Sequence, residues 1–120
     1  MAPGFSESFA REWVAAWNAH DLDRVLAHYE DDFEMHSPLI RSLAGVESGM
    51  LKGKSAVRAY WARALAAIPD LHFELLAALA GVDSVVVYYQ GHRGLVAEVF
   101  RFGATGKVRM ASAHYAEWPA

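Results

Sequence analysis

The stretch from Leu95 to Tyr115 constrains the fold of this chain more than any other segment. Read with the two-residue period of a β-strand, its first half places four side chains on one face: Val96, Glu98, Phe100 and Phe102. A carboxylate in a row with two phenylalanines is expected only where that face borders a core or a pocket. We therefore predict a strand whose inner face carries one acid, Glu98, into a cavity.

The second half of this stretch reads as the return strand of a hairpin. Residues 103–106 begin and end with glycine and predict a turn, and residues 107–117 predict the returning strand. On that strand Arg109, Ala111, Ala113 and Tyr115 share one face, while Met110, Ser112 and His114 share the other. Two alanines facing two phenylalanines leave volume that side chains do not fill, which again predicts a cavity.

Composition narrows the class of protein. The chain has 120 residues, of which 54% are hydrophobic and 21% charged, so we expect one folded domain spanning residues 1–120. The net charge is −3 and no basic run occurs, which argues against nucleic-acid binding. No segment has the length of a membrane span or the pattern of a secretion signal, so we expect no membrane partner and a cytoplasmic location.

The N-terminal third predicts two helices. Phe9, Trp13 and Trp17 recur at four-residue spacing after a potential cap at Ser6. Asp21 is placed to cap a second helix, whose apolar positions are Leu22, Val25, Leu26 and Tyr29. Such a short connection predicts an αα-hairpin.

The middle of the chain predicts one short strand, a loop and a helix. Residues 33–37 form the strand candidate, which Pro38 ends. Residues 39–53 lack a clear period and predict a long loop or a broken strand. Ser55 is a potential cap for a third helix that ends before Pro69. Strands are then predicted over residues 71–80 and 84–90, followed by the hairpin. Helices first and antiparallel strands later indicate an α+β domain.

Several short segments follow one another in a recognisable order: WVAAWNAHDLD at 13–23, YEDD at 29–32, a strand ending at Pro38, GKSAV at 53–57, and RF at 101–102 followed by GK at 106–107. In this order and spacing the chain resembles the nuclear transport factor 2-like superfamily, particularly its SnoaL-like and ketosteroid-isomerase-like branches. The resemblance implies a cone-shaped, strongly curved antiparallel sheet wrapped around helices, also called cystatin-like, with a deep apolar pocket. It also implies a homodimer formed through the sheet.

The residues at the catalytic positions of these families favour some reactions over others. In ketosteroid isomerases the base is an aspartate before the proline that closes the first strand, and here that position is Ser37. The phenolic donor corresponds to Trp13, and the protonated acid of the oxyanion hole corresponds to Glu98. Because an unactivated serine does not abstract a carbon-bound proton, steroid isomerisation is disfavoured. The SnoaL-like polyketide cyclases instead use a single acid in a hydrophobic cavity, a role that Glu98 could fill.

Two readings of Glu98 and of the histidines stay open at this point. Glu98 lies either in a pocket, where burial raises its pKa, or near a strand end, solvated or paired with Arg101 or Arg109. His36 and His114 alternate outward and reach a pocket only if a bulge reverses them, so they are secondary site candidates. No ligand-spaced set of histidines and acids occurs, and we expect no metal and no cofactor.

Two functions are consistent with these patterns. The first is an isomerase-, lyase- or cyclase-type acid–base enzyme acting on a hydrophobic carbonyl compound, with Glu98 and Ser37 as catalytic candidates. The second is a non-catalytic module that binds a small molecule or a protein. The aromatic residues either fill a core or line the pocket. The predicted ligand-binding residues are Trp13, Trp17, Met35, Tyr60, Trp61, Val87, Tyr89, Phe100, Ala111, Ala113 and Tyr115.

Overall fold

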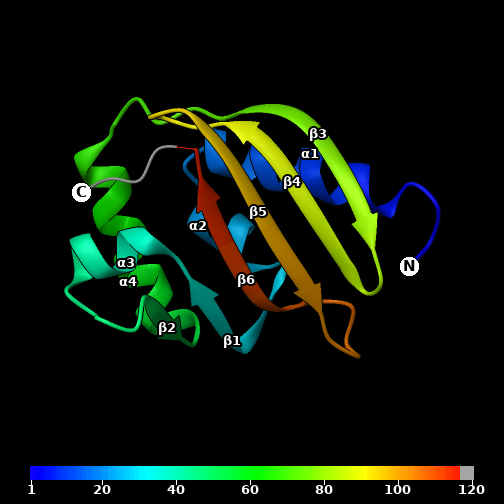
Figure 1. The fold of residues 1–120 in the computed structure, drawn as a ribbon, viewed down its shortest axis with the longest axis horizontal. Helices are drawn as coiled ribbons and strands as arrows, with labels where there is room; N and C mark the ends of the chain where they lie inside the picture. Colours follow the sequence, from blue (N-terminus) through cyan, green and yellow to red (C-terminus); the bar gives the residue numbers. More distant parts are fainter. Residues whose placement is uncertain (117–120) are drawn as a thin grey trace.

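The computed structural model describes residues 1–116 and contains four helices and six strands (Figure 1). The helices are α1 (Phe5–Asn18), α2 (Leu22–Leu26), α3 (Pro38–Ala44) and α4 (Lys54–Ala67). The strands are β1 (Tyr29–His36), β2 (Met50–Lys52), β3 (Glu74–Gly81), β4 (Ser84–Gln90), β5 (Leu95–Phe102) and β6 (Val108–Tyr115). The predicted α+β class is therefore confirmed.

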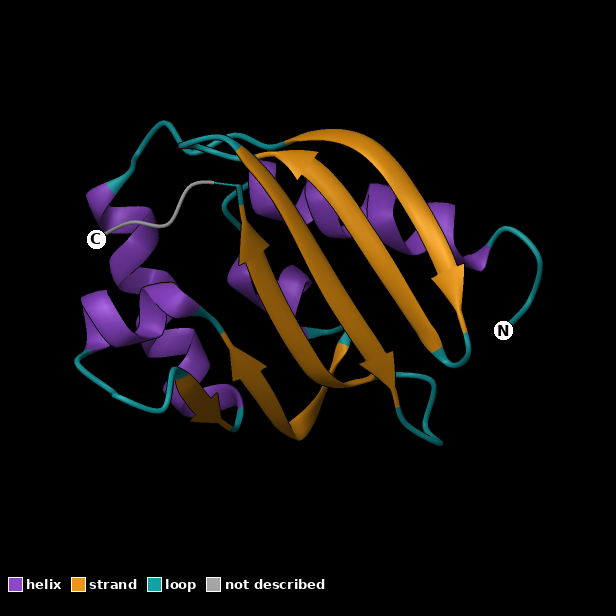
Figure 2. Ribbon diagram, in the orientation of Figure 1, coloured by secondary structure: helices purple, strands orange, loops and turns teal. Residues whose placement is uncertain are grey.

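The strands form one open sheet in the order β2-β1-β6-β5-β4-β3. Strand β1 runs parallel to β6, and the other neighbouring strands are antiparallel. The long strands β3 to β6 curve across one side of the molecule, and helices α1 and α2 lie behind them (Figure 2). The concave face of the sheet and the helices thus enclose the space in which the core and the site lie.

The aromatic stripe of α1 packs into this space. Phe9, Trp13 and Trp17 are all buried, and α1 contacts β3 and β4. The ring centroids of Trp13 and Phe100 lie 5.2 Å apart with their planes at 75°, an edge-to-face contact between α1 and β5. Helix and sheet are therefore joined by the residues that sequence periodicity assigns to the core.

Three helix caps were predicted, and one is confirmed. The carboxylate of Asp21 accepts a hydrogen bond of 3.1 Å from the backbone N–H of Arg24 at the start of α2. The other two predictions were wrong: α1 begins after Gly4 and α4 after Gly53, and neither helix has a side-chain cap. Both glycines adopt positive φ, a conformation that serine disfavours, so the chain turns into these helices earlier than Ser6 or Ser55.

The segment between the second and third predicted helices differs most from expectation. Residues 39–53, predicted as a long loop or a broken strand, contain most of α3 and the short strand β2. Strand β1 begins at Tyr29 instead of Phe33. Tyr29 therefore belongs to a strand, and α2 has only five residues. Strand β3 begins at Glu74, later than predicted. Strand β6 ends at Tyr115, and the predicted end at Glu117 lies outside the described residues.

In the part of the chain that the structure describes, no helix is long and apolar enough to cross a membrane.

Candidate functional site

Glu98 lies at the centre of the sheet, on its inner face. In strand β5 it is in register with Val87 of β4 on one side and Ala113 of β6 on the other. Only 4% of its surface is exposed. Arg101 and Arg109, the partners considered from the sequence, are exposed and form no ion pair with Glu98. Glu98 therefore lies on the inner face, as the alternation in β5 predicted, and is neither solvated nor paired with an arginine.

A cavity of about 410 Å³ reaches Glu98 from one end of the molecule. It lies between the inner face of the sheet and parts of α1, α3 and α4. Nine of the residues singled out from the sequence line it: Trp13, Trp17, Met35, Ser37, Tyr60, Trp61, Tyr89, Glu98 and Tyr115. The wall is mostly aromatic and aliphatic, which suits a flat, apolar ligand.

The hydrogen-bond environment of Glu98 is sparse for a buried carboxyl. The hydroxyl of Tyr89 donates a hydrogen bond of 3.1 Å to Oε1 of Glu98, and among residues 1–116 this is its one side-chain hydrogen bond. Burial raises the pKa of Glu98 to about 7, and the hydrogen bond from Tyr89 opposes this effect by lowering it. At neutral pH the group is therefore present both as an acid and as a carboxylate.

Four tyrosines surround this acid. Burial raises the pKa values of Tyr29, Tyr60, Tyr89 and Tyr115, that of Tyr60 to about 12, and the negative charge of Glu98 raises each of them further. All four phenols therefore stay protonated near neutral pH and can donate hydrogen bonds.

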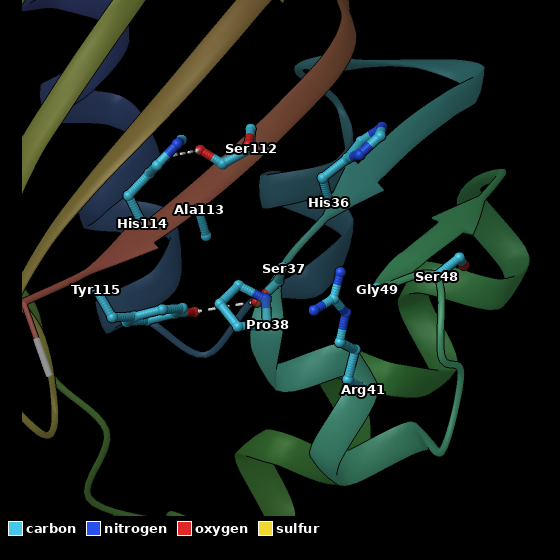
Figure 3. Close-up of a pocket in the computed structure, with 10 residues that line it drawn as sticks. All are labelled: His36, Ser37, Pro38, Arg41, Ser48, Gly49, Ser112, Ala113, His114 and Tyr115. Atoms are coloured by element: carbon cyan, nitrogen blue, oxygen red, sulfur yellow. Dashed lines mark hydrogen bonds between the residues drawn. The ribbon is translucent and has the colours of Figure 1, made fainter. Parts of the chain in front are cut away.

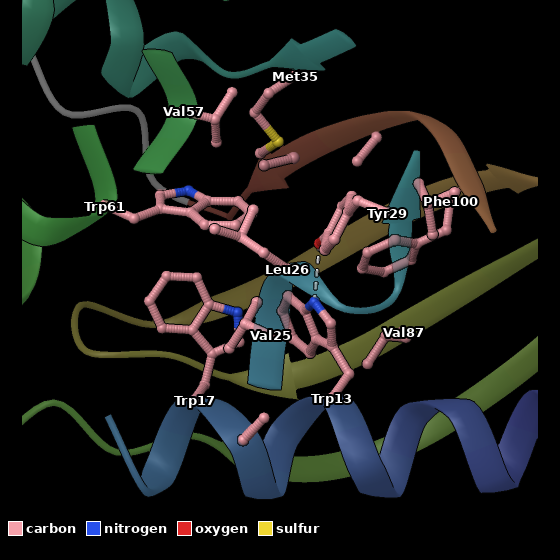
Figure 4. Close-up of a cluster of buried hydrophobic side chains, with 14 of the residues drawn as sticks. Trp13, Trp17, Val25, Leu26, Tyr29, Met35, Val57, Trp61, Val87 and Phe100 are labelled. Atoms are coloured by element: carbon pink, nitrogen blue, oxygen red, sulfur yellow. Dashed lines mark hydrogen bonds between the residues drawn. The ribbon is translucent and has the colours of Figure 1, made fainter. Parts of the chain in front are cut away.

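Tyr29 does not line the cavity, but its buried hydroxyl contacts Trp13, which does. Its hydroxyl accepts a hydrogen bond of 2.9 Å from Nε1 of Trp13, shown as a dashed line in Figure 4. Tyr29 is fully buried. Because it was assigned to the apolar stripe of a helix, no signal in the sequence placed its hydroxyl near Glu98. The indole of Trp13 is thus occupied in holding Tyr29.

Ser37 stands where β1 ends and α3 begins. Its Oγ accepts a hydrogen bond of 3.2 Å from the backbone N–H of Leu39, so the hydroxyl caps α3. The same oxygen lies 3.4 Å from the hydroxyl of Tyr115 (Figure 3). Ser37 also lowers the pKa of Tyr60, against the larger effect of burial. The serine therefore both starts a helix and contacts the phenol of Tyr115.

His36 and His114 line a different hollow, on the outer side of the Ser37–Tyr115 contact (Figure 3). Nε2 of His36 lies 3.2 Å from Oε1 of Glu34, and Nδ1 of His114 lies 3.2 Å from the carbonyl oxygen of Ser112. Neither histidine lines the cavity that holds Glu98. Alternation over residues 34–37 and 110–115 points both histidines outward, and the irregularities of β1 and β6 lie before these stretches.

Four predicted ligand-binding residues do not line the cavity. Val87, Phe100 and Ala111 are fully buried in the core, and Ala113 borders the outer hollow. In their place the cavity is lined by residues that the sequence analysis did not select: Leu39, Ser42, Leu43, Ala64, Ala67, Ile68, Leu71, Phe73 and residues 91–96. Most of these belong to α3, to the end of α4 and to connections, where no periodic pattern shows which side chains face inward.

A metal site has no structural support in residues 1–116, where no group of three histidine, cysteine or acidic side chains gathers.

Comparisons with known proteins show the family and the fold of this chain. Residues 10–116 match the family model described as the SnoaL-like domain. A SnoaL-like protein of unknown function from Burkholderia thailandensis is 56% identical, with a TM-score of 0.94 over 97% of this chain and 98% of that chain.

Two more distant structures share the fold. A protein from Catenulispora acidiphila with a ketosteroid isomerase-like fold, in complex with trimethylamine, has a TM-score of 0.70 at 18% identity, over 92% of this chain and 86% of that chain. TerC, co-crystallised with polyporic acid, has a TM-score of 0.73 at 15% identity, over 92% of this chain and 90% of that chain.

Proposed function

The chain belongs to the SnoaL-like family, and we propose that it is an acid–base enzyme in which Glu98 moves a proton on a hydrophobic carbonyl compound. One observation carries the proposal: a buried carboxyl with a pKa of about 7 borders an apolar cavity. A group with this pKa serves as both proton donor and proton acceptor at neutral pH. No cofactor is needed for such a step.

The residues around Glu98 suggest how it would act. As a neutral acid, Glu98 donates a hydrogen bond to the carbonyl oxygen of the ligand and stabilises the negative charge that develops there. As a carboxylate, it accepts a proton from the carbon next to the carbonyl. Tyr89 already donates to Oε1 of Glu98, and Tyr60 and Tyr115 supply further hydroxyl donors on the cavity wall. Ser37 would help to hold Tyr115 in place.

The geometry favours chemistry with a single acid over steroid isomerisation. Ser37 occupies the position of the isomerase base, and its Oγ is engaged at the start of α3. Trp13 occupies the position of the isomerase phenol, and its N–H is donated to Tyr29. Glu98 is the one carboxylate among the described residues that line the cavity. A cyclase-type reaction, in which one acid protonates and deprotonates the same substrate, needs no second base.

The alternative is a binding protein that uses the same cavity without catalysis. Glu98 is the one carboxylate on the described cavity wall, and the histidine that lines the wall, His92, is exposed, which favours a binding protein. Two proteins of this fold were crystallised with small molecules, polyporic acid and trimethylamine, which supports a ligand in the cavity but not a reaction.

A thermal-shift screen tests the role of Glu98 in the cavity. Wild type, Glu98→Gln and the control Glu74→Gln would be screened against steroids, polyketide-like aromatics, terpenoid epoxides and fatty acids. Glu74 is exposed on β3, so its substitution removes the same charge away from the cavity. We expect a compound that stabilises wild type and Glu74→Gln but not Glu98→Gln.

The hit is then incubated with each variant and followed by mass spectrometry or NMR. A rearranged product that forms with wild type and Glu74→Gln, but not with Glu98→Gln, supports the enzyme. A ligand that stays unchanged in all three samples supports the binding protein, and an equal thermal shift in all three would contradict the role of Glu98.

A further inference from the structure

The rim of the cavity carries positive charge. Among the described residues that line the cavity, the charged or titratable side chains other than tyrosine are Glu98, His92 and Arg93. Glu98 is buried, whereas His92 and Arg93 are exposed in the connection between β4 and β5. The cavity is therefore polarised, with an acid in its depth and basic groups at its mouth.

The connection that carries these two residues is a tight turn. The backbone N–H of Gly91 donates a hydrogen bond of 2.7 Å to the carbonyl oxygen of Gly94. Gly94 adopts φ of +143°, which favours glycine, and a Cβ added to Gly91 would lie 3.0 Å from Cγ2 of Val96. Space favours glycine at position 91 and backbone conformation favours it at position 94, and His92 and Arg93 are the two central residues of the turn. Their position at the mouth is set by backbone geometry.

The spacing along β5 sets a length for a ligand that touches both ends. A strand rises about 3.4 Å per residue, so Leu95 and Glu98 are separated by about 10 Å. Arg93 lies two residues before Leu95, and its long side chain extends the reach of the turn. A molecule that contacts both Glu98 and Arg93 is therefore about as long as two or three linked rings.

We propose that the cavity selects an elongated apolar molecule with a neutral carbonyl at one end, held by Glu98, and a carboxylate at the other, held by Arg93 with the help of His92. This inference rests on the proposed function, because it places the carbonyl at Glu98. The inference adds the class of substrate to the proposed function, and Arg93 is the residue that selects this class.

Charge fixes the orientation of such a molecule. A carboxylate pushed toward Glu98 would lose its hydration and meet a second acid in an apolar space. At the mouth the same carboxylate keeps part of its hydration and gains the guanidinium of Arg93, which binds carboxylates through two parallel N–H donors. The neutral end is then the one that enters.

The test compares an acid with its ester. The probe is 4′-acetylbiphenyl-4-carboxylic acid, which has a ketone at one end and a carboxylate at the other, and its methyl ester is the neutral control. Binding would be measured by isothermal titration calorimetry at pH 7.5 with wild type, Arg93→Gln and Arg101→Gln. Arg101 lies in the same strand as Glu98 but is exposed at the far end from the mouth, so it serves as the matched control.

We expect wild type and Arg101→Gln to bind the acid about fivefold more tightly than the ester, the effect of one exposed ion pair. Arg93→Gln should bind the two probes equally, and added salt should weaken binding of the acid but not of the ester. Equal binding of acid and ester by wild type would overturn the role of Arg93 and leave the proposed role of Glu98 intact. If neither probe binds, the substrate class is overturned, while the thermal-shift screen still tests Glu98 separately.

Discussion

Glu98 makes the stability of this protein depend on pH. Its pKa is about 7 in the folded protein and about 4.5 when unfolded, because burial disfavours the charged form. The folded state therefore binds more protons between these values, and its free energy of unfolding falls as the pH rises from 4.5 to 7. A shift of this size corresponds to a loss of about 3 kcal/mol, complete above pH 7.

The prediction is checked by urea unfolding of wild type and Glu98→Gln at intervals from pH 4.5 to 8. Glutamine does not titrate, so the difference between the two proteins isolates residue 98 from the histidines. We expect the free energy of unfolding of wild type to fall by about 3 kcal/mol relative to Glu98→Gln as the pH rises. Parallel pH profiles would mean that Glu98 is not buried in solution.

For single residues, the sequence predicted where some side chains of the candidate site lie, but it gave no indication of others. Alternation along β5 is a local pattern, and it was enough to place Glu98 on the inner face beside Phe100. Alternation does not tell a cavity wall from a packed core, so Phe100 was assigned to the ligand although it contacts Trp13. Arg93 was not among the residues selected from the sequence, because nothing local shows that its turn borders the cavity.

Among the elements, α3 differs most from the prediction, although the sequence contains residues that favour the start of a helix there. Pro38 was read as the end of a strand, but proline is also favoured in the first turn of a helix, and serine is favoured just before it. The helix has only seven residues, too few to show a helical period. Because α3 forms one wall of the cavity, the missed helix is also the reason that Leu39, Ser42 and Leu43 were missed.

The cap of α3 gives a prediction at the level of this element. Ser37→Ala removes the oxygen that accepts from the N–H of Leu39, and we expect the free energy of unfolding to fall by about 1 kcal/mol. Ser37→Asn keeps a capping oxygen and should recover most of this loss. Chemical denaturation followed by circular dichroism measures both. If alanine and asparagine are equally stable, the hydroxyl does not cap α3.

The pairing of β1 with β6 could not be predicted from local sequence patterns. β1 and β6 lie side by side and parallel, with Met35 in register with Ala111, although 76 residues separate them along the chain. This pairing explains why the strand begins as early as Tyr29, which is in register with Val108. The local sequence shows only the apolar spacing of residues 22–29, which is equally typical of a helix.

On the scale of the whole molecule, the outer face of the sheet has an apolar centre. The helices α1 and α2 lie behind the sheet, and its other face is turned toward the viewer in Figure 2. Leu79, Val86, Val99 and Ser112 form one row across this face. The rows on either side of it contain Tyr88, Ala97 and His114, and Ser84, Arg101 and Met110. The apolar side chains at the centre of this face are partly exposed, and polar side chains border them. This apolar centre supports the expectation of a homodimer formed through the sheet.

We predict that the protein sediments as a dimer at micromolar concentration and that Val99→Lys weakens association at least about tenfold. Val99 lies in the middle of the outer face, where a lysine in a two-fold interface would bury two charges without partners. Val82→Lys is the matched control, because Val82 is 89% exposed in the turn between β3 and β4. Sedimentation velocity over a range of concentrations measures both variants.

A wild type that stays monomeric, or a Val82→Lys variant that dissociates as readily as Val99→Lys, would show that the outer face is not the interface. The helices and the cavity lie on the other side of the sheet, so both variants should still bind the biphenyl probe.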